Sequence, residues 1–194
     1  MGKIFYIMGK SSSGKDTIFK SVSEQMPELK TIVLYTTRPI RAGEREGKEY
    51  YFVEEEKRLE LEQAGKVIES RTYQTVHGLW SYFTVDDGQI DLEEENYIVI
   101  GTLESYEKMC HYFGRAKMVP IYIEIEDGER LTRAMKREQS QKEPKYEELC
   151  RRFLADAKDF SGEELKRQEI VKRFVNLKLD DCTKEILLYI REQL

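Results

Sequence analysis

Short apolar runs alternate with longer polar segments of helical periodicity along most of the chain. The runs have the length of buried strands, and several are bounded by glycine or proline. The pattern predicts strands over residues 3–8, 31–35, 50–53, 66–70, 71–76, 97–100, 119–125 and 173–179. It predicts helices over residues 18–26, 54–64, 104–112, 130–138, 147–160 and 183–194. Strands and helices in this alternation predict an α/β fold with three layers and a parallel central sheet.

A loop rich in glycine and serine links the first predicted strand to the first helix. Residues 3–20 read KIFYIMGKSSSGKDTIFK and satisfy G-x-x-x-x-G-K between a strand and a helix. Such a loop can turn successive N–H groups toward an anion, and the N-terminus of the next helix adds further unpaired N–H groups. Lys15 supplies a positive charge that can follow a phosphoryl group as it moves. The pattern indicates a phosphate-binding loop whose candidate residues are Gly9, Ser11, Ser12, Ser13, Gly14, Lys15, Asp16 and Thr17.

The residue after Lys15 departs from this pattern. A serine or threonine that binds Mg²⁺ is usual there, whereas this chain has Asp16 followed by Thr17. A carboxylate is a good ligand for Mg²⁺ and also suits the first turn of a helix. Asp16 and Thr17 are therefore the candidate metal ligands.

Length and composition fit one globular domain of 194 residues, with 36% charged and 40% hydrophobic residues. No apolar run approaches a membrane span or has the features of a signal peptide, so a cytoplasmic protein without membrane contact is expected. Three widely spaced cysteines suggest reduced thiols rather than a disulfide framework. The net charge of −5 argues against a general nucleic-acid binder. Basic residues nevertheless cluster at 38–48 and 130–152, where anions can be held.

The first basic cluster lies in the segment 36–53, which reads TTRPIRAGEREGKEYYFV. Arginines held in a loop downstream of a phosphate-binding loop suit a second phosphorylated substrate, because guanidinium groups bind phosphate in a planar, bidentate way. The segment resembles the monophosphate-binding segment of guanylate kinases, T-T-R-x-x-R-x-G-E-x-x-G-x-x-Y-x-F-V. The resemblance implies that Arg38, Arg41 and Tyr50 bind the phosphate of a nucleoside monophosphate.

Further along the chain the resemblance assigns more residues. The triplet at 67–69 is similar to one in which a glutamate helps to bind GMP, which makes Glu69 a candidate. Tyr82 and Thr84 match only loosely the tyrosine and the Ser or Thr of the family's Y-Y-G-T/S, and His77 is expected to be structural. The family's D-x-D after the next strand is absent, with Glu104 as a displaced substitute at most. The lid arginines of the family are matched by Arg133, Arg137 and Arg152.

The resemblance covers most of the chain and implies a P-loop NTPase-type fold of one domain. It divides this domain into a core at 1–33 and 91–194, a monophosphate-binding insert at about 34–90 and a lid at about 132–150. The implied activity is transfer of the γ-phosphoryl group of ATP, with Mg²⁺, to GMP. The implied catalytic residues are Lys15, Arg38, Arg133, Arg137 and Arg152, and the implied partners are small-molecule nucleotides.

Two alternatives stay open from the sequence. The incomplete set of base-reading residues permits a kinase for a different monophosphate. A non-catalytic module that holds a phosphorylated partner is the second alternative, although Gly14 and Lys15 favour a working ATP loop. The sequence does not indicate the oligomeric state.

Overall fold

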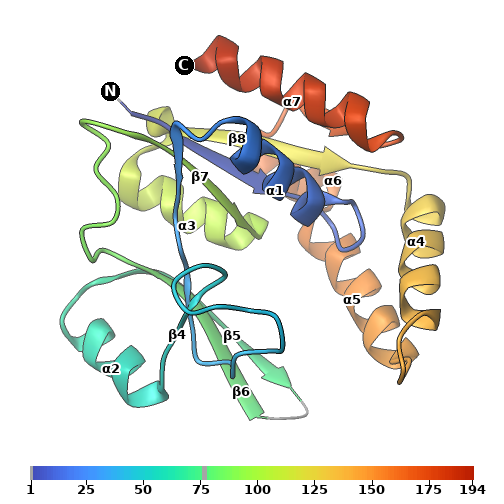
Figure 1. The fold of residues 1–194 in the computed structure, drawn as a ribbon, viewed down its shortest axis with the longest axis horizontal. Helices are drawn as coiled ribbons and strands as arrows, with labels where there is room; N and C mark the ends of the chain where they lie inside the picture. The colour runs from blue at the N-terminus through green and yellow to red at the C-terminus, as the bar shows by residue number, and fades with distance from the viewer. Residues whose placement is uncertain (1, 76–77) are drawn as a thin grey trace.

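A parallel five-stranded sheet forms the centre of the computed structural model, which describes residues 2–75 and 78–194. The strand order is β2-β7-β1-β8-β9, and each neighbouring pair runs parallel (Figure 1). The five strands are β1 (Ile4–Met8), β2 (Leu29–Thr31), β7 (Asn96–Gly101), β8 (Met118–Glu124) and β9 (Arg173–Val175). This arrangement confirms the α/β fold with a parallel central sheet.

Helices cover both faces of the central sheet, because alternate side chains of each strand point to opposite sides. In β1, Phe5 and Ile7 pack against α1 (Lys15–Gln25) and α7 (Leu179–Gln193). Ile4, Tyr6 and Met8 face the other side, toward α3 (Leu103–Phe113) and α6 (Gly162–Arg167). Every residue of β1 is fully buried, which explains the uninterrupted apolar run at the start of the chain.

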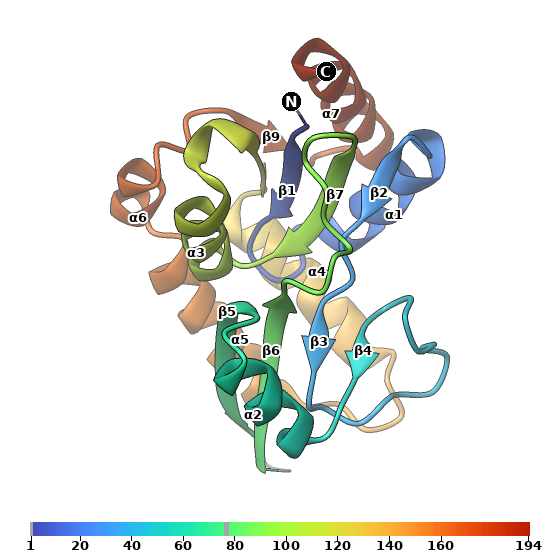
Figure 2. The same cartoon turned by 90° about the vertical axis from the view of Figure 1, so that its left-hand side faces the viewer.

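A second, smaller sheet has four strands in the order β4-β3-β6-β5 and lies beyond the carboxyl ends of the central strands (Figure 2). Its strands are β3 (Tyr35–Thr36), β4 (Tyr51–Phe52), β5 (Val67–Thr75) and β6 (Gly78–Val85), with α2 (Glu55–Gln63) between the second and third. β5 and β6 form a long antiparallel hairpin that packs against α3. The division of the chain into core, insert and lid stays a prediction.

The remaining elements flank β8 in the chain. They are α4 (Asp127–Gln139), α5 (Tyr146–Asp159) and the short 3-10 helix η1 (Arg115–Lys117), which precedes β8. α4 and α5 pack against each other and project from the end of the central sheet (Figure 1). The polar segment 140–145 connects them.

Several predicted elements differ from the structure. The predicted strand 31–35 is two strands, because residues 32–34 carry the chain from β2 of the central sheet to β3 of the second sheet. The predicted strands 66–70 and 71–76 form one strand, β5, within the described residues. β9 ends at Val175 and α7 begins at Leu179, so the chain turns earlier than the predicted strand 173–179 and helix 183–194.

The sequence pattern missed β6 and α6. β6 begins with exposed and half-buried residues and ends with three buried ones, so its sequence lacks a regular alternation. α6 has six residues, too few for a periodic signal. Val76 and His77 lie outside the described residues.

All three cysteines are free thiols, two of them buried. Burial raises the pKa of the Cys182 thiol to about 11, so this thiol stays protonated. In the described part of the chain, no helix combines the length and apolar character needed to span a membrane.

Candidate active site

The phosphate-binding loop joins β1 to α1 at the carboxyl edge of the central sheet. Two of its residues adopt left-handed backbone conformations: Ser12 has a φ of 64° and Gly14 a φ of 89°. Gly14 directly precedes α1 and Lys15 is the first helical residue. This geometry is that of a tight loop opening onto a helix N-terminus, as the G-x-x-x-x-G-K pattern predicts.

Asn176 supports the loop from the end of β9. Its side-chain amide donates a hydrogen bond of 2.7 Å to the carbonyl oxygen of Ser13. A Cβ atom on residue 14 would lie 2.3 Å from the same Asn176 nitrogen. Gly14 is therefore required both by its positive φ and by the close approach of this amide.

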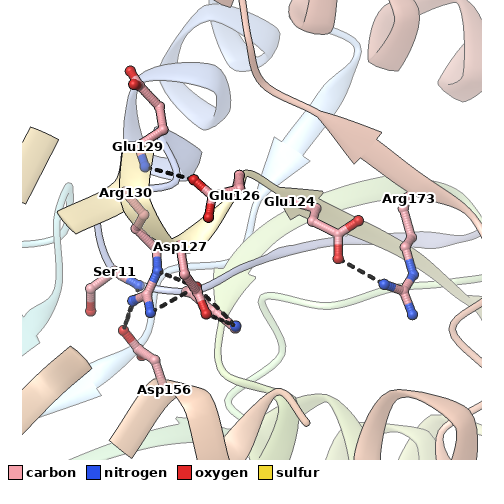
Figure 3. Close-up of polar contacts among 9 residues, drawn as sticks. Ser11, Glu124, Glu126, Asp127, Glu129, Arg130, Asp156 and Arg173 are labelled. Carbon is pink, nitrogen blue, oxygen red and sulfur yellow. Dashed lines mark hydrogen bonds and ion pairs between the residues drawn. The ribbon is translucent and has the colours of Figure 1, made fainter. Parts of the chain in front are cut away.

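A group of charged side chains fixes the other side of the loop (Figure 3). The backbone N–H of Ser11 donates to Asp156 of α5 at 2.8 Å, and Asp156 also accepts from Arg130 of α4 at 3.0 Å. Arg130 is 1% exposed and also pairs with Asp127, which in turn binds Lys10 of the loop at 3.2 Å. A carboxylate thus already occupies one loop amide, which shows that this backbone binds negative oxygen.

Figure 3 also shows how the end of β8 leads into α4. Glu126 caps α4 by accepting a hydrogen bond from the backbone N–H of Glu129. Backbone N–H groups of Gly128, and then of Glu129, lower the pKa of Glu126, because N–H groups at a helix start stabilise a carboxylate. Glu124 pairs with Arg173 of β9 at the protein surface.

Lys15, Asp16 and Thr17 lie at the start of α1. The ammonium group of Lys15 lies 3.3 Å from the Asp16 carboxylate, whose side chain is 84% exposed. Among the described residues, no group of three or more His, Cys, Asp or Glu side chains forms a metal site. An exposed carboxylate and a hydroxyl nevertheless fit Mg²⁺ that arrives with a nucleotide, because Mg²⁺ takes few protein ligands and completes its shell with phosphate oxygens and water.

Arg38 lies buried in the second sheet, just after β3. Its guanidinium group forms a bidentate pair with Glu44, with N···O distances of 2.8 and 2.9 Å. Hydrogen bonds from Arg38 lower the pKa of Glu44, so the pair stays ionised. The Nε atom of Arg38 is buried without a hydrogen-bond partner among the described residues. A buried donor without a partner calls for an explanation, and a bound phosphate would supply one.

Aromatic rings surround this guanidinium. Its central carbon lies 5.4 Å from the centre of the Tyr50 ring, and the Tyr50 and Tyr82 rings lie 5.7 Å apart. Burial raises the pKa of Tyr50, while Arg38 acts to lower it and the more distant Asp16 to raise it. Tyr50 also packs against the apolar cluster that includes Met8 at the end of β1. Arg41 is exposed in the same loop, with its backbone N–H bound to Glu44.

Glu69 has no exposed side-chain surface and is fully engaged by neighbours. Arg71 binds both of its carboxylate oxygens, at 3.0 and 3.2 Å, and the Thr84 hydroxyl donates to one of them at 2.8 Å. Arg71 reaches Thr102 with its remaining terminal nitrogen at 3.2 Å. Burial opposes the charge on Arg71, but Glu69 outweighs burial and raises the pKa of Arg71. Glu104, the displaced substitute considered for the missing acidic residues, binds Lys108 instead.

The three candidate lid arginines occupy α4 and α5. Arg133 pairs with Glu129 and donates to the carbonyl oxygen of Asn176 at 3.1 Å. Arg137 and Arg152 are both exposed and line one hollow together with Ser11 and Ser12 of the phosphate-binding loop. The structure therefore brings two predicted lid arginines to the loop from different helices.

Arg152 shares its carboxylate partner with Arg151. Both donate to Glu148, at distances of 2.6 to 2.9 Å. Hydrogen bonds from Arg151, and then from Arg152, lower the pKa of Glu148 to about 2. Glu148 thus holds these two cations near the hollow.

Sequence reasoning missed four residues of the site. Arg130 and Asp156 sit in charged helices where nothing marks them as buried, so only the packing of α4 on α5 reveals them. Asn176 follows a predicted strand at the carboxyl edge of the sheet, a position that could have been recognised. Arg71 lies two residues after Glu69, a spacing that places both on one face of a strand and was available from the sequence.

The parallel sheet, the loop at its carboxyl edge and the helix that follows define a P-loop nucleotide-binding α/β protein. A family model described as guanylate kinase matches residues 1–186. A guanylate kinase from Caldanaerobacter subterraneus is 31% identical over 158 residues, covering 78% of this chain and 70% of the relative. The chain belongs to the guanylate kinase family.

Other relatives match over shorter stretches. A guanylate kinase from Rhodopseudomonas palustris is 43% identical over 68 residues, and the match covers 35% of this chain and 31% of that protein. The chain thus spans about a third of the length of the first curated relatives it matches. The crystal structure of guanylate kinase from Anaplasma phagocytophilum has the same fold, with a TM-score of 0.69 and 22% identity. The match covers 99% of this chain and 86% of the chain in that structure.

Proposed function

We propose that this protein transfers the γ-phosphoryl group of ATP to a nucleoside monophosphate, with GMP as the leading acceptor. One observation carries the proposal: the same chain holds a phosphate-binding loop and, in a separate sheet, a buried arginine with an unpaired donor. Tyr50, which lies against Arg38, also packs on the apolar cluster that contains Met8 just before the loop, so the two anion sites belong to one region. The family and its named relatives support this activity.

The loop residues 9–17 bind the phosphates of ATP through backbone N–H groups and the start of α1. The Lys15 ammonium group neutralises charge on the transferring phosphoryl group. Asp16 and Thr17 are the residues that would contact Mg²⁺ bound with the nucleotide. The metal supplies charge neutralisation on the phosphates when it is bound.

Arg38, Arg41, Tyr50 and Tyr82 bind the phosphate of the acceptor in line with ATP. The unpaired Nε of Arg38 donates to this phosphate, while Glu44 holds the guanidinium group in place. Arg41 is exposed and can turn toward the phosphate once the acceptor is present. Phosphoryl transfer then depends on positioning rather than on a protein base.

Arg133, Arg137 and Arg152 stabilise the charge that spreads over the equatorial oxygens in the transition state. Arg137 and Arg152 reach the loop from α4 and α5, so movement of these two helices would close the site. Closure excludes water that would otherwise hydrolyse ATP.

The partners that we expect from this activity are small nucleotides rather than nucleic acid. We expect a cytoplasmic location, because these nucleotides occur there.

A kinase for another monophosphate is the second candidate, and one observation favours it. Glu69, the residue assigned to base binding, is closed off by Arg71 and Thr84. A non-catalytic module that binds a phosphorylated partner through Arg38 and Arg41 would leave the phosphate-binding loop without a purpose.

ADP release with ATP, Mg²⁺ and a panel of nucleoside monophosphates tests the proposal. We expect Lys15→Ala to lower kcat at least about 100-fold, as the loss of one preorganised transition-state donor does. Lys20→Ala, on the exposed side of the same helix, should leave kcat unchanged. Arg41→Ala should raise the KM for the acceptor, whereas Arg45→Ala in the same loop should not.

The panel also separates the candidates. Turnover with GMP supports the leading acceptor, and turnover with another monophosphate alone supports the second candidate. No turnover with any acceptor refutes the proposed activity and supports a binding module.

A further inference from the structure

The ion pair between Glu69 and Arg71 has only one member at the protein surface. The Glu69 side chain is 0% exposed, and Thr84, which donates to it, is also fully buried. The Arg71 side chain is 6% exposed. A molecule that approaches this pair without rearranging it therefore meets the guanidinium group and not the carboxylate.

The hydrogen-bonding capacity of Glu69 is also largely used. An ionised carboxylate only accepts hydrogen bonds, so it could contact guanine only at the edge that carries the N1–H and 2-amino donors. Arg71 occupies both carboxylate oxygens through a two-point contact, and Thr84 adds a third hydrogen bond. A second two-point contact from a base edge would have to displace Arg71.

Arg71 itself retains donors. A guanidinium group has five N–H groups, and the contacts to Glu69 and Thr102 use one on each nitrogen. The described residues therefore leave one N–H on each terminal nitrogen for a ligand. N–H groups on the two terminal nitrogens of a guanidinium group can bind two neighbouring acceptor atoms.

Arg71 lies on the same face of the second sheet as Tyr82, one of the rings next to the proposed phosphate site. In the β5–β6 hairpin Arg71 lies directly opposite Tyr82, and residues opposite each other share a face of the sheet. The Tyr82 ring contacts the Tyr50 ring, which lies against Arg38. A nucleotide whose phosphate binds at Arg38 could extend its base along this face toward Arg71.

We propose that Arg71, rather than Glu69, reads the acceptor base, by donating to the O6 and N7 atoms of a 6-oxopurine monophosphate. The inference rests on the proposed function and names its acceptor class. Arginine donates to these two atoms of guanine in a bidentate way. Glu69 then acts as a positioning residue that holds the guanidinium group.

A comparison of GMP with IMP tests this assignment, because IMP keeps O6 and N7 but lacks the 2-amino group. If Arg71 reads O6 and N7, the kcat/KM values for the two acceptors should agree within about threefold. If Glu69 reads the 2-amino edge, GMP should be preferred by at least about tenfold, since a hydrogen bond to a charged group is lost. A tenfold preference for GMP, or a preference for CMP or UMP, would overturn the inference.

Variants of Arg71 sharpen the test. Arg71→Lys keeps the charge beside Glu69 and should fold, but it lacks the two-point fork and should lower kcat/KM about 10- to 100-fold for both purines. Arg71→Met uncovers Glu69 and should raise the ratio of GMP to IMP at least about tenfold. Arg58→Met is the matched control, because Arg58 pairs with two carboxylates on α2 of the same region. Arg58→Met should change neither the kcat/KM values nor the ratio of GMP to IMP.

Binding measured without ATP separates this inference from the proposed function. Calorimetry should give similar dissociation constants for GMP and IMP with the wild-type protein and a preference for GMP with Arg71→Met. Binding with this pattern but no turnover would refute the kinase and keep the assignment of Arg71. Absence of binding by either purine at millimolar concentration would refute the assignment of Arg71.

Discussion

Single residues explain why the phosphate-binding loop has its sequence. Gly14 is held at a positive φ with the Asn176 amide against it, and Ser12 adopts a left-handed conformation next to it. Strain of this kind persists where the surrounding structure enforces it, as at ligand sites. The loop is therefore preformed before any nucleotide binds.

We expect Gly14→Ala to lower the free energy of unfolding by about 2–4 kcal/mol. Of this, about 1 kcal/mol is the left-handed backbone and the rest is the displacement of Asn176 from Ser13. Gly43→Ala is the control, because Gly43 has nearly the same φ, 88°, but nothing within 4 Å of the added Cβ. Urea unfolding of both variants measures the difference. An equal loss in the free energy of unfolding for both variants would show that the Asn176 contact is unimportant.

Glu148 gives a pH dependence whose sign follows from its pKa. Its folded-state pKa of about 2 lies below the ordinary value of 4.5, so its contribution is present above pH 4.5 and is lost as the pH falls toward 2. Because its side chain is 39% exposed, we expect only about 0.5 kcal/mol. Glu148→Gln should lower stability at pH 6 by this amount and have no effect at pH 2. A loss that is equal at both pH values would contradict the ion-pair explanation.

At the scale of elements, α4 and α5 are tied to the phosphate-binding loop by buried charge. Arg130 is among the largest fully buried side chains. The central carbon of its guanidinium group lies 4.0 Å from the centre of the Phe153 ring. Its ion pairs join α4 to α5, and Asp156 extends the contact to the loop. The two helices that carry the candidate lid arginines are thus fixed to the phosphate-binding loop at Arg130 and Asp156.

We expect Asp156→Ala to lower the free energy of unfolding by about 2–3 kcal/mol, because a nearly buried guanidinium group loses one of its two carboxylates. The amide of Ser11 should also exchange its hydrogen faster. Glu124→Ala breaks an exposed pair with Arg173 and should cost about 0–1 kcal/mol. Urea unfolding and amide hydrogen exchange provide the two readouts. An unchanged exchange rate at Ser11 would show that Asp156 does not order the loop.

At the scale of the whole molecule, the two proposed substrates bind to different sheets. In the proposed function, ATP binds at the edge of the central sheet and the acceptor binds on the second sheet, and these are separate sheets. Transfer in line requires the two to approach, since reacting atoms must come within about 3–3.5 Å. We infer that the second sheet and the helices α4 and α5 close over the central sheet.

Small-angle scattering tests this closure. GMP and a non-hydrolysable ATP analogue together should bring the radius of gyration toward the about 16 Å expected of a compact chain of this length. Either nucleotide alone should have a smaller effect, because only the pair draws both regions together. A radius that does not respond to both ligands would contradict closure.

The sequence alone determined the central sheet, the phosphate-binding loop and most helices. These depend on local signals: uninterrupted apolar runs, the G-x-x-x-x-G-K spacing and the 3.6-residue period. The order of the strands and the split of residues 31–35 between two sheets did not follow from the sequence. A strand cannot reveal from its own residues which sheet will accept it.

Only the tertiary structure decided which charged residues are buried and which are paired with a neighbour. The sequence marks Glu69 and Arg38 as equivalent candidates, yet Arg38 keeps a free buried donor and Glu69 is enclosed by Arg71 and Thr84. Arg130 looks like any surface arginine in the sequence and is fully buried in the structure. The reason is physical: a charge is available to a ligand or committed to a neighbour according to distances between elements far apart in the chain, which no local pattern records.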